Sequence, residues 1–170
     1  SESSLKMAFE LAEGADLAVT IGGASVGDHD LVGKVAGDLG MERSFYKVAM
    51  RPGKPLMAGR FGSGAMVGLP GNPVSAMICG RVFAVPMLFA MLGLPPAAEN
   101  LMSAPLAAPL PANGPRQHYM RAVWKDAGLQ AFDSQDSSLL SVLAQAEALI
   151  VRPPHDPARD VGERVDYLAI

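Results

Sequence analysis

The chain has 170 residues, of which 49% are apolar, and a net charge of −3 at pH 7. This length and composition suit one ordinary domain or two small ones with an apolar core, and they exclude a disordered chain. The single cysteine, Cys79, excludes an internal disulfide and a cysteine-rich metal site. No apolar run reaches the roughly 20 residues that cross a membrane, and the first residues do not resemble a signal peptide. We therefore expect a cytoplasmic protein that binds neither membranes nor nucleic acids.

The charges are unevenly distributed along the sequence. No acidic residue lies between Glu42 and Glu99, whereas six cations do: Arg43, Lys47, Arg51, Lys54, Arg60 and Arg81. Such a segment attracts anions over a distance. A solvated basic edge without a ligand is the alternative interpretation of the composition.

The first 95 residues predict an α/β arrangement. Residues 4–12 have apolar side chains at helical spacing, and residues 16–23, DLAVTIGG, form a short apolar run that ends in two glycines. Such a run is typical of a buried parallel strand followed by a tight turn. A second helix is expected from Leu31 to Leu39, with Asp28 as its N-cap and Gly40 just beyond its end.

Residues 45–51, FYKVAMR, alternate in character and predict a further strand. In a strand, Lys47 and Arg51 would lie on one face, about 13 Å apart. Two more short strands are expected at residues 55–60 and 65–69.

The longest helix is expected to start at Asn72-Pro73, because Asn is a strong N-cap and Pro is favoured at the first helical position. Pro86 should kink this helix. Cys79 lies in its middle and is interpreted as a buried, small apolar residue and not as a nucleophile.

Beyond residue 96 the composition changes, and strands predominate. Residues 97–115 are rich in Ala and Pro. The remainder predicts a short helix at 138–146 and strands at 117–124, 128–132, 148–152 and 165–170. The first part opens with a helix and not with the strand that normally starts a doubly wound domain, so we expect earlier strands to be missing from this sequence.

Three segments of the first part offer groups that bind anions. The glycine loop at 22–30, GGASVGDHD, has backbone N–H groups that can approach a ligand, and its two aspartates could cap a helix or hold Mg²⁺. Lys47, Arg51 and Lys54 provide cations for an oxyanion. The segment 68–73, GLPGNP, precedes the free N–H groups of the long helix. Ordinary turns and caps are the alternative, so the residues indicate only an oxyanion-binding α/β domain joined to a small β domain.

Three motifs follow one another in the chain: DLAVTIGGASVGDHD, FYKVAMRPGKPLMAGR and GLPGNPVSAM. Together they resemble the molybdopterin molybdenumtransferase (molybdenum insertase) family, which includes bacterial MoeA and the E domain of gephyrin. The resemblance covers residues 5–95 and continues more faintly to the end of the sequence. It implies a partial three-layer molybdopterin-binding domain with a mostly parallel sheet at residues 1–96, then a small β-barrel domain at 97–170. It also implies a C-terminal fragment of a longer, homodimeric protein.

The resemblance further implies an activity. Members of the family insert molybdate into adenylylated molybdopterin with Mg²⁺-dependent release of AMP, so these are the expected substrates and cofactor. Asp30, Lys47 and Arg51 are the expected catalytic residues, with Asp30 also the metal ligand, although the family often has Lys at the position of Arg51. Substrate contacts are expected from Gly22, Gly23, Ser25, Gly27, Lys54, Pro70, Gly71, Asn72, Pro73 and Ser75.

In the second part, RQHYMRA and QDSSLL are similar to family segments, and this similarity assigns Arg121 and Ser137 to molybdate binding. A surface arginine and a helix N-cap serine are the alternatives for these two residues. Three other functions stay open. They are an adenylyltransferase that makes the adenylylated intermediate and resembles the binding domain alone, a non-catalytic scaffold, and a fragment without activity of its own.

Overall fold

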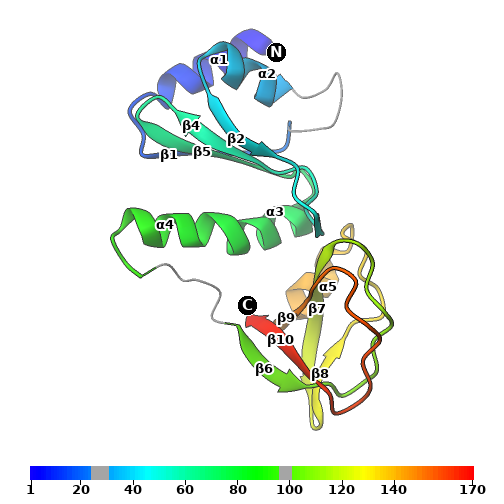
Figure 1. Ribbon diagram of the computed structural model, residues 1–170. Coiled ribbons are helices and arrows are strands. Elements are labelled where there is room, and N and C mark those ends of the chain that lie inside the picture. The colour runs from blue at the N-terminus through cyan, green and yellow to red at the C-terminus, as the bar shows by residue number, and fades with distance from the viewer. Residues whose placement is uncertain (24–30, 96–100) are drawn as a thin grey trace. The chain divides into compact units, whose positions relative to one another are not determined.

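The computed structural model describes residues 1–23, 31–95 and 101–170 (Figure 1). They form two compact units, and each is described by itself. Unit 1 comprises Ser1–Val48 and Gly53–Gly80, and unit 2 comprises Ala49–Pro52 and Arg81–Ile170. The chain therefore leaves unit 1 for four residues in the middle of the cationic segment, and then returns to it.

Unit 1 is built on a four-stranded sheet with strand order β1-β5-β4-β2. β1 (Leu17–Ile21) pairs in parallel with β5 (Gly64–Leu69), whereas β4 (Met57–Phe61) is antiparallel to both β5 and β2 (Glu42–Tyr46). The predicted parallel first strand is confirmed, but a mostly parallel sheet is wrong for the described residues. The cause is the tight turn between β4 and β5, because a hairpin can join only antiparallel strands.

Helices flank both faces of this sheet (Figure 1). α1 (Glu2–Leu11) and α2 (Leu31–Asp38) lie side by side on one face, and α3 (Pro73–Cys79) lies on the other. α1 begins after Ser1, whose hydroxyl oxygen accepts the N–H of Ser4. The first two helices pack on the sheet through one cluster of buried side chains: Phe9, Val32, Val35, Ala36, Met57 and Met66.

The predicted strand over residues 45–51 is wrong. β2 ends at Tyr46, and β3 (Met50–Arg51) is a separate strand that pairs in parallel with a strand of unit 2. Lys47 has a φ of +76°, which lies in the left-handed region and cannot continue a strand. Its N–H instead donates to the carbonyl of Leu56 at 2.9 Å. Lys47 and Arg51 therefore do not share a strand face.

The predicted long helix is confirmed at its start and changes geometry in its middle. α3 is followed by a π-helical stretch, Gly80–Ala84, and then by α4 (Val85–Met91). Pro86 lacks an N–H and crowds the carbonyl one turn earlier, and a widened turn before it accommodates both defects. By length and composition alone, the run Pro73–Met91 could cross a membrane, with 19 residues and a mean hydropathy of 1.8. One such helix is weak support for a membrane span, because core helices of other proteins share these properties.

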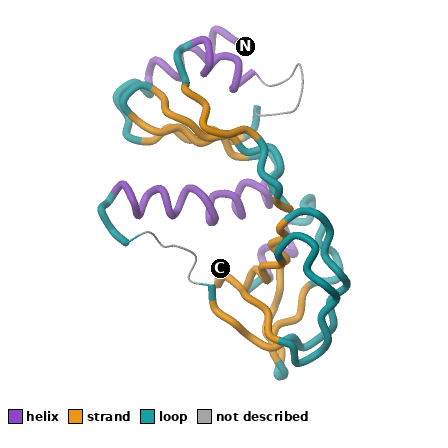
Figure 2. Tube along the Cα trace, in the orientation of Figure 1, coloured by secondary structure: helices purple, strands orange, loops and turns teal. Residues whose placement is uncertain are grey.

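Unit 2 contains the strands that the second half of the sequence predicts. The path β3-β7-β9-β10-β6 forms its sheet, and β8 also pairs with β7. The strands are β6 (Met102–Pro105), β7 (Gln117–Lys125), β8 (Gly128–Ala131), β9 (Ala148–Arg152) and β10 (Arg164–Ala169), with α5 (Leu140–Gln145) between β8 and β9. Their apolar side chains form one buried cluster: Ala104, Leu106, Leu110, Ala122, Leu129, Ala148, Ile150 and Val165. The tube view in Figure 2 shows the long loops that connect these strands.

The predicted barrel is not closed in the described part of unit 2. The path of paired strands ends at β3 on one side and at β6 on the other. Within this path, β3 and β7 are the pair that runs parallel. One isolated bridge between Leu106 and Leu129 brings the residues after β6 beside β8, and the N–H of Ala107 donates to the carbonyl of Leu129 at 2.8 Å. Unit 2 is therefore an open, mixed sheet, because a single bridge does not make a ladder.

Two glycines test the packing of unit 1. A Cβ on Gly59 in β4 would lie 2.3 Å from the carbonyl oxygen of Glu42 in β2, whereas a Cβ on Gly37 in α2 would meet nothing within 4 Å. We expect Gly59→Ala to lower the free energy of unfolding by about 1–3 kcal/mol, because the backbone of β2 must move. Gly37→Ala should raise it by about 0.5–1 kcal/mol. Urea unfolding measures both changes, and equal effects would contradict the close approach of β2 and β4.

Candidate functional site

The ends of the two parallel strands bring two of the predicted anion-binding loops together in unit 1. Ile21 and Leu69 are Cα partners at the ends of β1 and β5, and the N–H of Gly22 donates to the carbonyl of Leu69 at 3.0 Å. A Cβ on Gly71 would lie 3.2 Å from the Cα of Gly22. Glycine at both positions allows the two backbones to approach this closely, so the first and third predicted loops meet at one edge of the sheet.

The first loop has the backbone that its glycines predict. Gly22 and Gly23 have φ values of +82° and +70°, which favour glycine. A Cβ on Gly23 would also lie 2.4 Å from a methyl group of Val32. This position therefore excludes a side chain for two reasons, conformation and space.

The remaining predicted residues of this loop, Ser25, Gly27 and Asp30, lie outside the described residues, as does the predicted N-cap Asp28. Within the described ranges there is no group of three or more His, Cys, Asp or Glu residues that could hold a metal ion. The predicted metal ligand Asp30 therefore stays a prediction.

The third loop starts α3 as the sequence predicts. The side-chain oxygen of Asn72 accepts the N–H of Ser75 at 3.1 Å, and Pro73 occupies the first turn. Pro70 and Ser75 are buried, whereas Gly71 and Pro73 are exposed. The exposed Gly71 and the capped first turn are thus the parts of this loop that a ligand can reach.

The predicted cationic turn is divided between the two units. Lys47 and Lys54 belong to unit 1, where the N–H of Val48 donates to the carbonyl of Lys54 at 3.2 Å. Lys47 also lies 5.3 Å from the centroid of the Tyr46 ring, in cation–π contact. Both lysines are exposed. Arg51, by contrast, is part of unit 2 through the pairing of β3 with β7.

In unit 2, Arg51 is the end of a row of basic residues that sequence reasoning missed. Arg51 is the Cα partner of His118, and His118 is the Cα partner of Arg152. Direct partners across a sheet present their side chains on the same face. All three line one concavity of about 290 Å³ with the loop at 111–114, Met120, Asp133 and Gln135. Alternation within residues 117–124 could have placed His118 and Met120 on one face, but the partner strands are not evident in the sequence.

Arg121, a predicted molybdate ligand, is 1% exposed and is not a surface arginine. Its two terminal nitrogens donate to the carbonyls of Asp136 and Leu139 at 3.1 and 3.2 Å. Burial lowers the pKa of this guanidinium below its ordinary value. Its Nε has no partner among the described residues. Arg121 therefore holds the turn that contains Ser137 in place.

Ser137 is half-buried in this turn and does not cap α5, whose N-cap is Leu139 without a side-chain hydrogen bond. The carboxylate of Asp136 instead accepts the N–H of Ser138 at 2.9 Å, and this hydrogen bond lowers the pKa of Asp136 below its ordinary value. The alternative of an N-cap serine is thus wrong for residue 137. The turn leaves the hydroxyl of Ser137 without a structural role that the geometry identifies.

A buried ion-pair cluster supports one wall of the concavity in unit 2. The Nε of Arg152 donates to the carboxylate of Asp156, and Arg159 binds the other oxygen of that carboxylate at 2.6 Å. Another nitrogen of Arg152 donates to the carbonyls of Pro157 at 2.6 Å and Pro111 at 3.2 Å. Hydrogen bonding by Arg159 and then by Arg152 holds the pKa of Asp156 below its ordinary value. These contacts fix the 111–114 loop against the end of β9.

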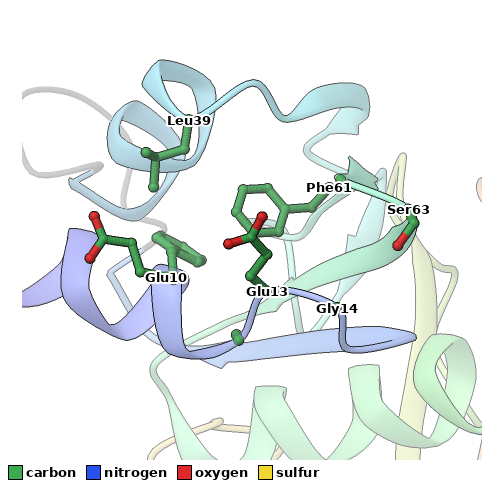
Figure 3. Close-up of a pocket in the computed structure, with 9 residues that line it drawn as sticks. Glu10, Glu13, Gly14, Leu39, Phe61 and Ser63 are labelled. Carbon is green, nitrogen blue, oxygen red and sulfur yellow. The ribbon is translucent and has the colours of Figure 1, made fainter.

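A second concavity, of about 380 Å³, lies in unit 1 at the end of α1 (Figure 3). Its lining includes Phe9, Glu10, Glu13 and Phe61 and contains none of the predicted site residues. Figure 3 shows the carboxylate of Glu13 beside the ring of Phe61. Two carboxylates oppose an anionic ligand, so the predicted substrate is not assigned to this place.

Cys79 is fully buried in α3, as the sequence predicts. Burial raises the pKa of its thiol to about 12, and the sulfur lies 3.9 Å from the carbonyl oxygen of Gly53 as a weak donor. A thiol with so high a pKa is not a nucleophile near neutral pH. The interpretation of Cys79 as a packing residue is therefore confirmed.

The cap of α3 gives a direct test of the third loop. Asn72→Ala removes the acceptor of the Ser75 N–H, so we expect the free energy of unfolding to fall by about 1 kcal/mol. Asn72→Asp keeps an acceptor and adds a charge that a helix start favours, so stability should be retained. Urea unfolding compares the two variants. An equal loss in both would show that the hydrogen bond accepted by the side chain of residue 72 is not the source of the stability.

Comparison with protein families assigns both units. Residues 1–90 match the family described as "Probable molybdopterin binding domain", and residues 103–170 match the "MoeA C-terminal region (domain IV)".

Curated relatives agree with this assignment. The chain is 40% identical over 116 residues to Molybdopterin molybdenumtransferase 2 of Mycobacterium tuberculosis strain H37Rv, an alignment that covers 64% of the chain and 28% of that relative. It is 32% identical to the Molybdopterin molybdenumtransferase of Nostoc sp. over 82% of the chain and 34% of that relative. It is 28% identical to the Molybdopterin molybdenumtransferase of Bacillus subtilis over 99% of the chain and 40% of that relative. The chain thus spans about a quarter to two fifths of the length of these relatives.

The fold is also similar to a solved structure. The crystal structure titled as the molybdopterin biosynthesis MoeA protein from Pyrococcus horikosii matches 99% of this chain and 41% of that one, with a TM-score of 0.77 and 24% identity. At this identity the likeness shows the fold alone, and the family assignment rests on the matched domains. On those two domains, the chain belongs to the MoeA family, the family of the molybdopterin molybdenumtransferases.

Proposed function

We propose that the protein acts in molybdenum cofactor biosynthesis, where it inserts molybdate into adenylylated molybdopterin and releases AMP. The observation that supports this proposal most is the meeting of Gly22 and Gly71 at the ends of β1 and β5. Ligands of open α/β sheets bind outside the carboxyl ends of the parallel strands. The family match at residues 1–90 supports a pterin as that ligand.

In this proposal the edge of unit 1 binds the phosphate groups of the substrate. Gly23, Ser25 and Gly27 are proposed to supply backbone N–H groups or a hydroxyl from the first loop. Gly22, whose N–H donates to Leu69, contributes through the close approach of its backbone. The third loop contributes from the other side, where Pro70 and Ser75 are buried supports for the half-buried Asn72 and the exposed residues Gly71 and Pro73. Close backbone approach at both glycines brings the two loops together, so that one phosphate could contact N–H groups of both.

The cations then attract and orient the charged groups. Lys47 and Lys54 are exposed on adjacent backbone segments of unit 1, and Arg51 is exposed in unit 2. In the proposed reaction Lys47 and Lys54 bind the anionic phosphate within unit 1, and Arg51 binds an oxyanion within unit 2. Arg51 can bind an oxyanion through two parallel N–H groups, which a lysine at this position could not do.

Asp30 is the proposed acid of the first loop and the proposed ligand of Mg²⁺. When bound, the ion would supply positive charge to the phosphate oxygens during cleavage. Arg121 and Ser137 remain the proposed contacts of molybdate. The terminal nitrogens of Arg121 also donate to two carbonyls, so this side chain in addition positions the turn of Ser137.

The match of residues 103–170 to the MoeA C-terminal region supports the insertase over an adenylyltransferase, which resembles the pterin-binding domain alone. A scaffold would not need Lys47, Arg51 and Asp30. The domain boundary after residue 96, a homodimer of the complete protein and a cytoplasmic location belong to the same proposal.

Release of AMP tests the proposal. The complete protein, as its gene encodes it, is mixed with adenylylated molybdopterin, molybdate and Mg²⁺, and AMP is measured by chromatography. We expect Asp30→Ala to slow release by roughly 10²-fold or more, in the range typical of a lost catalytic carboxylate. Asp126→Ala, in the exposed turn between β7 and β8, is the matched control and should release AMP at the unsubstituted rate.

Two outcomes would count against the proposal. If the unsubstituted protein releases no AMP, the insertase function is wrong. If Asp30→Ala releases AMP as fast as Asp126→Ala, the role of Asp30 is wrong. Thermal unfolding of both variants shows that a slow rate does not come from loss of the fold.

A further inference from the structure

The concavity of unit 2 contains a buried histidine whose ring has no assigned role. His118 lies between Arg51 and Arg152 in the row across β3, β7 and β9, and it is 7% exposed. No hydrogen bond to its imidazole occurs within the described residues, although the side chain lines the concavity of about 290 Å³. A buried polar ring that lacks a partner and faces a hollow has a free donor and a free acceptor for a ligand.

The two arginines beside His118 differ in how many partners their side chains already bind. Arg152 is 2% exposed, and its side chain already binds Asp156 and the carbonyls of Pro111 and Pro157. Arg51 is exposed and forms no ion pair with any described residue. Arg51 is therefore the cation of this row that remains available to an incoming anion.

Every charged group of unit 2 that acts on His118 can be named. Arg51 faces it from β3, Arg152 from β9, and Arg116 and Arg121 lie near it at the start and on the body of β7. The carboxylates in this region are Asp133 on the wall of the concavity, Asp136 beyond Arg121, and Asp156 paired with Arg152. Burial first, and then these four arginines, lower the pKa of His118 to about 4. The imidazole is therefore neutral near pH 7 while the concavity is empty.

A divalent oxyanion bound in the concavity would shift the pKa of His118 upward. It supplies two negative charges at the position where the arginines supply positive ones, and an opposite charge within about 4–6 Å shifts a pKa by roughly 1–3 units. The protonated ring could then donate an N–H to the anion. Arg51 would bind the same anion, and the proton would come from the solvent.

We propose that His118 couples the binding of a divalent tetrahedral oxyanion in the Arg51–His118–Arg152 row to the uptake of one proton by its imidazole. This inference rests on the proposed function, because it takes molybdate as the oxyanion. The concavity is a binding position in addition to the proposed contacts at Arg121 and Ser137, which do not line it. It adds a positioning residue and a pH dependence that the family motifs do not include. Protonation adds a donor to the site only when the anion is present, so acidification favours the loaded protein.

The coupling is measured by calorimetric titration of the complete protein with micromolar molybdate in two buffers that differ in ionisation enthalpy. If the bound anion raises the pKa of His118 by about 2.5 units, we expect uptake of roughly half a proton at pH 6.5. The dissociation constant should then fall by roughly tenfold between pH 8 and pH 5.5.

His118→Gln keeps a side chain with an N–H donor but cannot be protonated. We expect it to bind molybdate without proton uptake and with a dissociation constant that changes little between pH 8 and pH 5.5. His155→Asn is the matched control, because His155 is exposed in the same unit and its φ of +58° is one that Asn also adopts. This control should take up the same number of protons as the unsubstituted protein.

The outcomes separate this inference from the proposed function. Equal proton uptake by His118→Gln and the unsubstituted protein overturns the role of His118 and leaves the insertase proposal standing. Failure of the unsubstituted protein to bind molybdate at all overturns both. If the variant does not fold, NMR titration of the His118 ring in the unsubstituted protein decides the question. A pKa that molybdate does not raise overturns the coupling.

Discussion

The parallel pairing of β1 with β5 is the constraint on which the candidate site depends. The register ends with Ile21 opposite Leu69, so both strands stop at the same edge and both following loops leave from it. The hydrogen bond from Gly22 to the carbonyl of Leu69 extends this register by one residue. A shift of one residue would move the glycine loop away from Gly71 and turn the buried faces of the strand outward. The close contact of the two loops is thus a consequence of strand register and of two residues without side chains.

The second constraint is electrostatic, and it lies in unit 2. Buried arginines need partners, and here carbonyl groups and one shared carboxylate provide them for Arg121 and Arg152. Arg51 forms no ion pair with any described residue, and it belongs to unit 2 because β3 leaves unit 1 for four residues. The four residues at which the chain leaves unit 1 interrupt the predicted strand, and they place the cation Arg51 beside His118.

Features set by a few neighbouring residues could be predicted from the sequence. The Asn72 cap, the positive φ at Gly22 and Gly40, the burial of Cys79 and most strands of unit 2 are of this kind. Features that depend on partners far along the chain could not be predicted from the sequence. The alternation of residues 45–51 gives no sign that Lys47 adopts a left-handed conformation or that Met50 and Arg51 pair with a strand far along the chain. The burial of Arg121 and the row through His118 follow from the same long-range pairings. Local patterns therefore neither revealed the row nor excluded a surface position for Arg121.

A crystal structure of the complete protein with adenylylated molybdopterin tests the central claim most directly. The account predicts the phosphate groups of the substrate at the edge where Gly22 and Gly71 meet, within hydrogen-bond distance of backbone N–H groups from both loops. A substrate bound elsewhere, for example in the concavity lined by Glu10 and Glu13, would contradict it. So would a substrate that contacts only one of the two loops, because the close approach of the glycines would then have no part in binding.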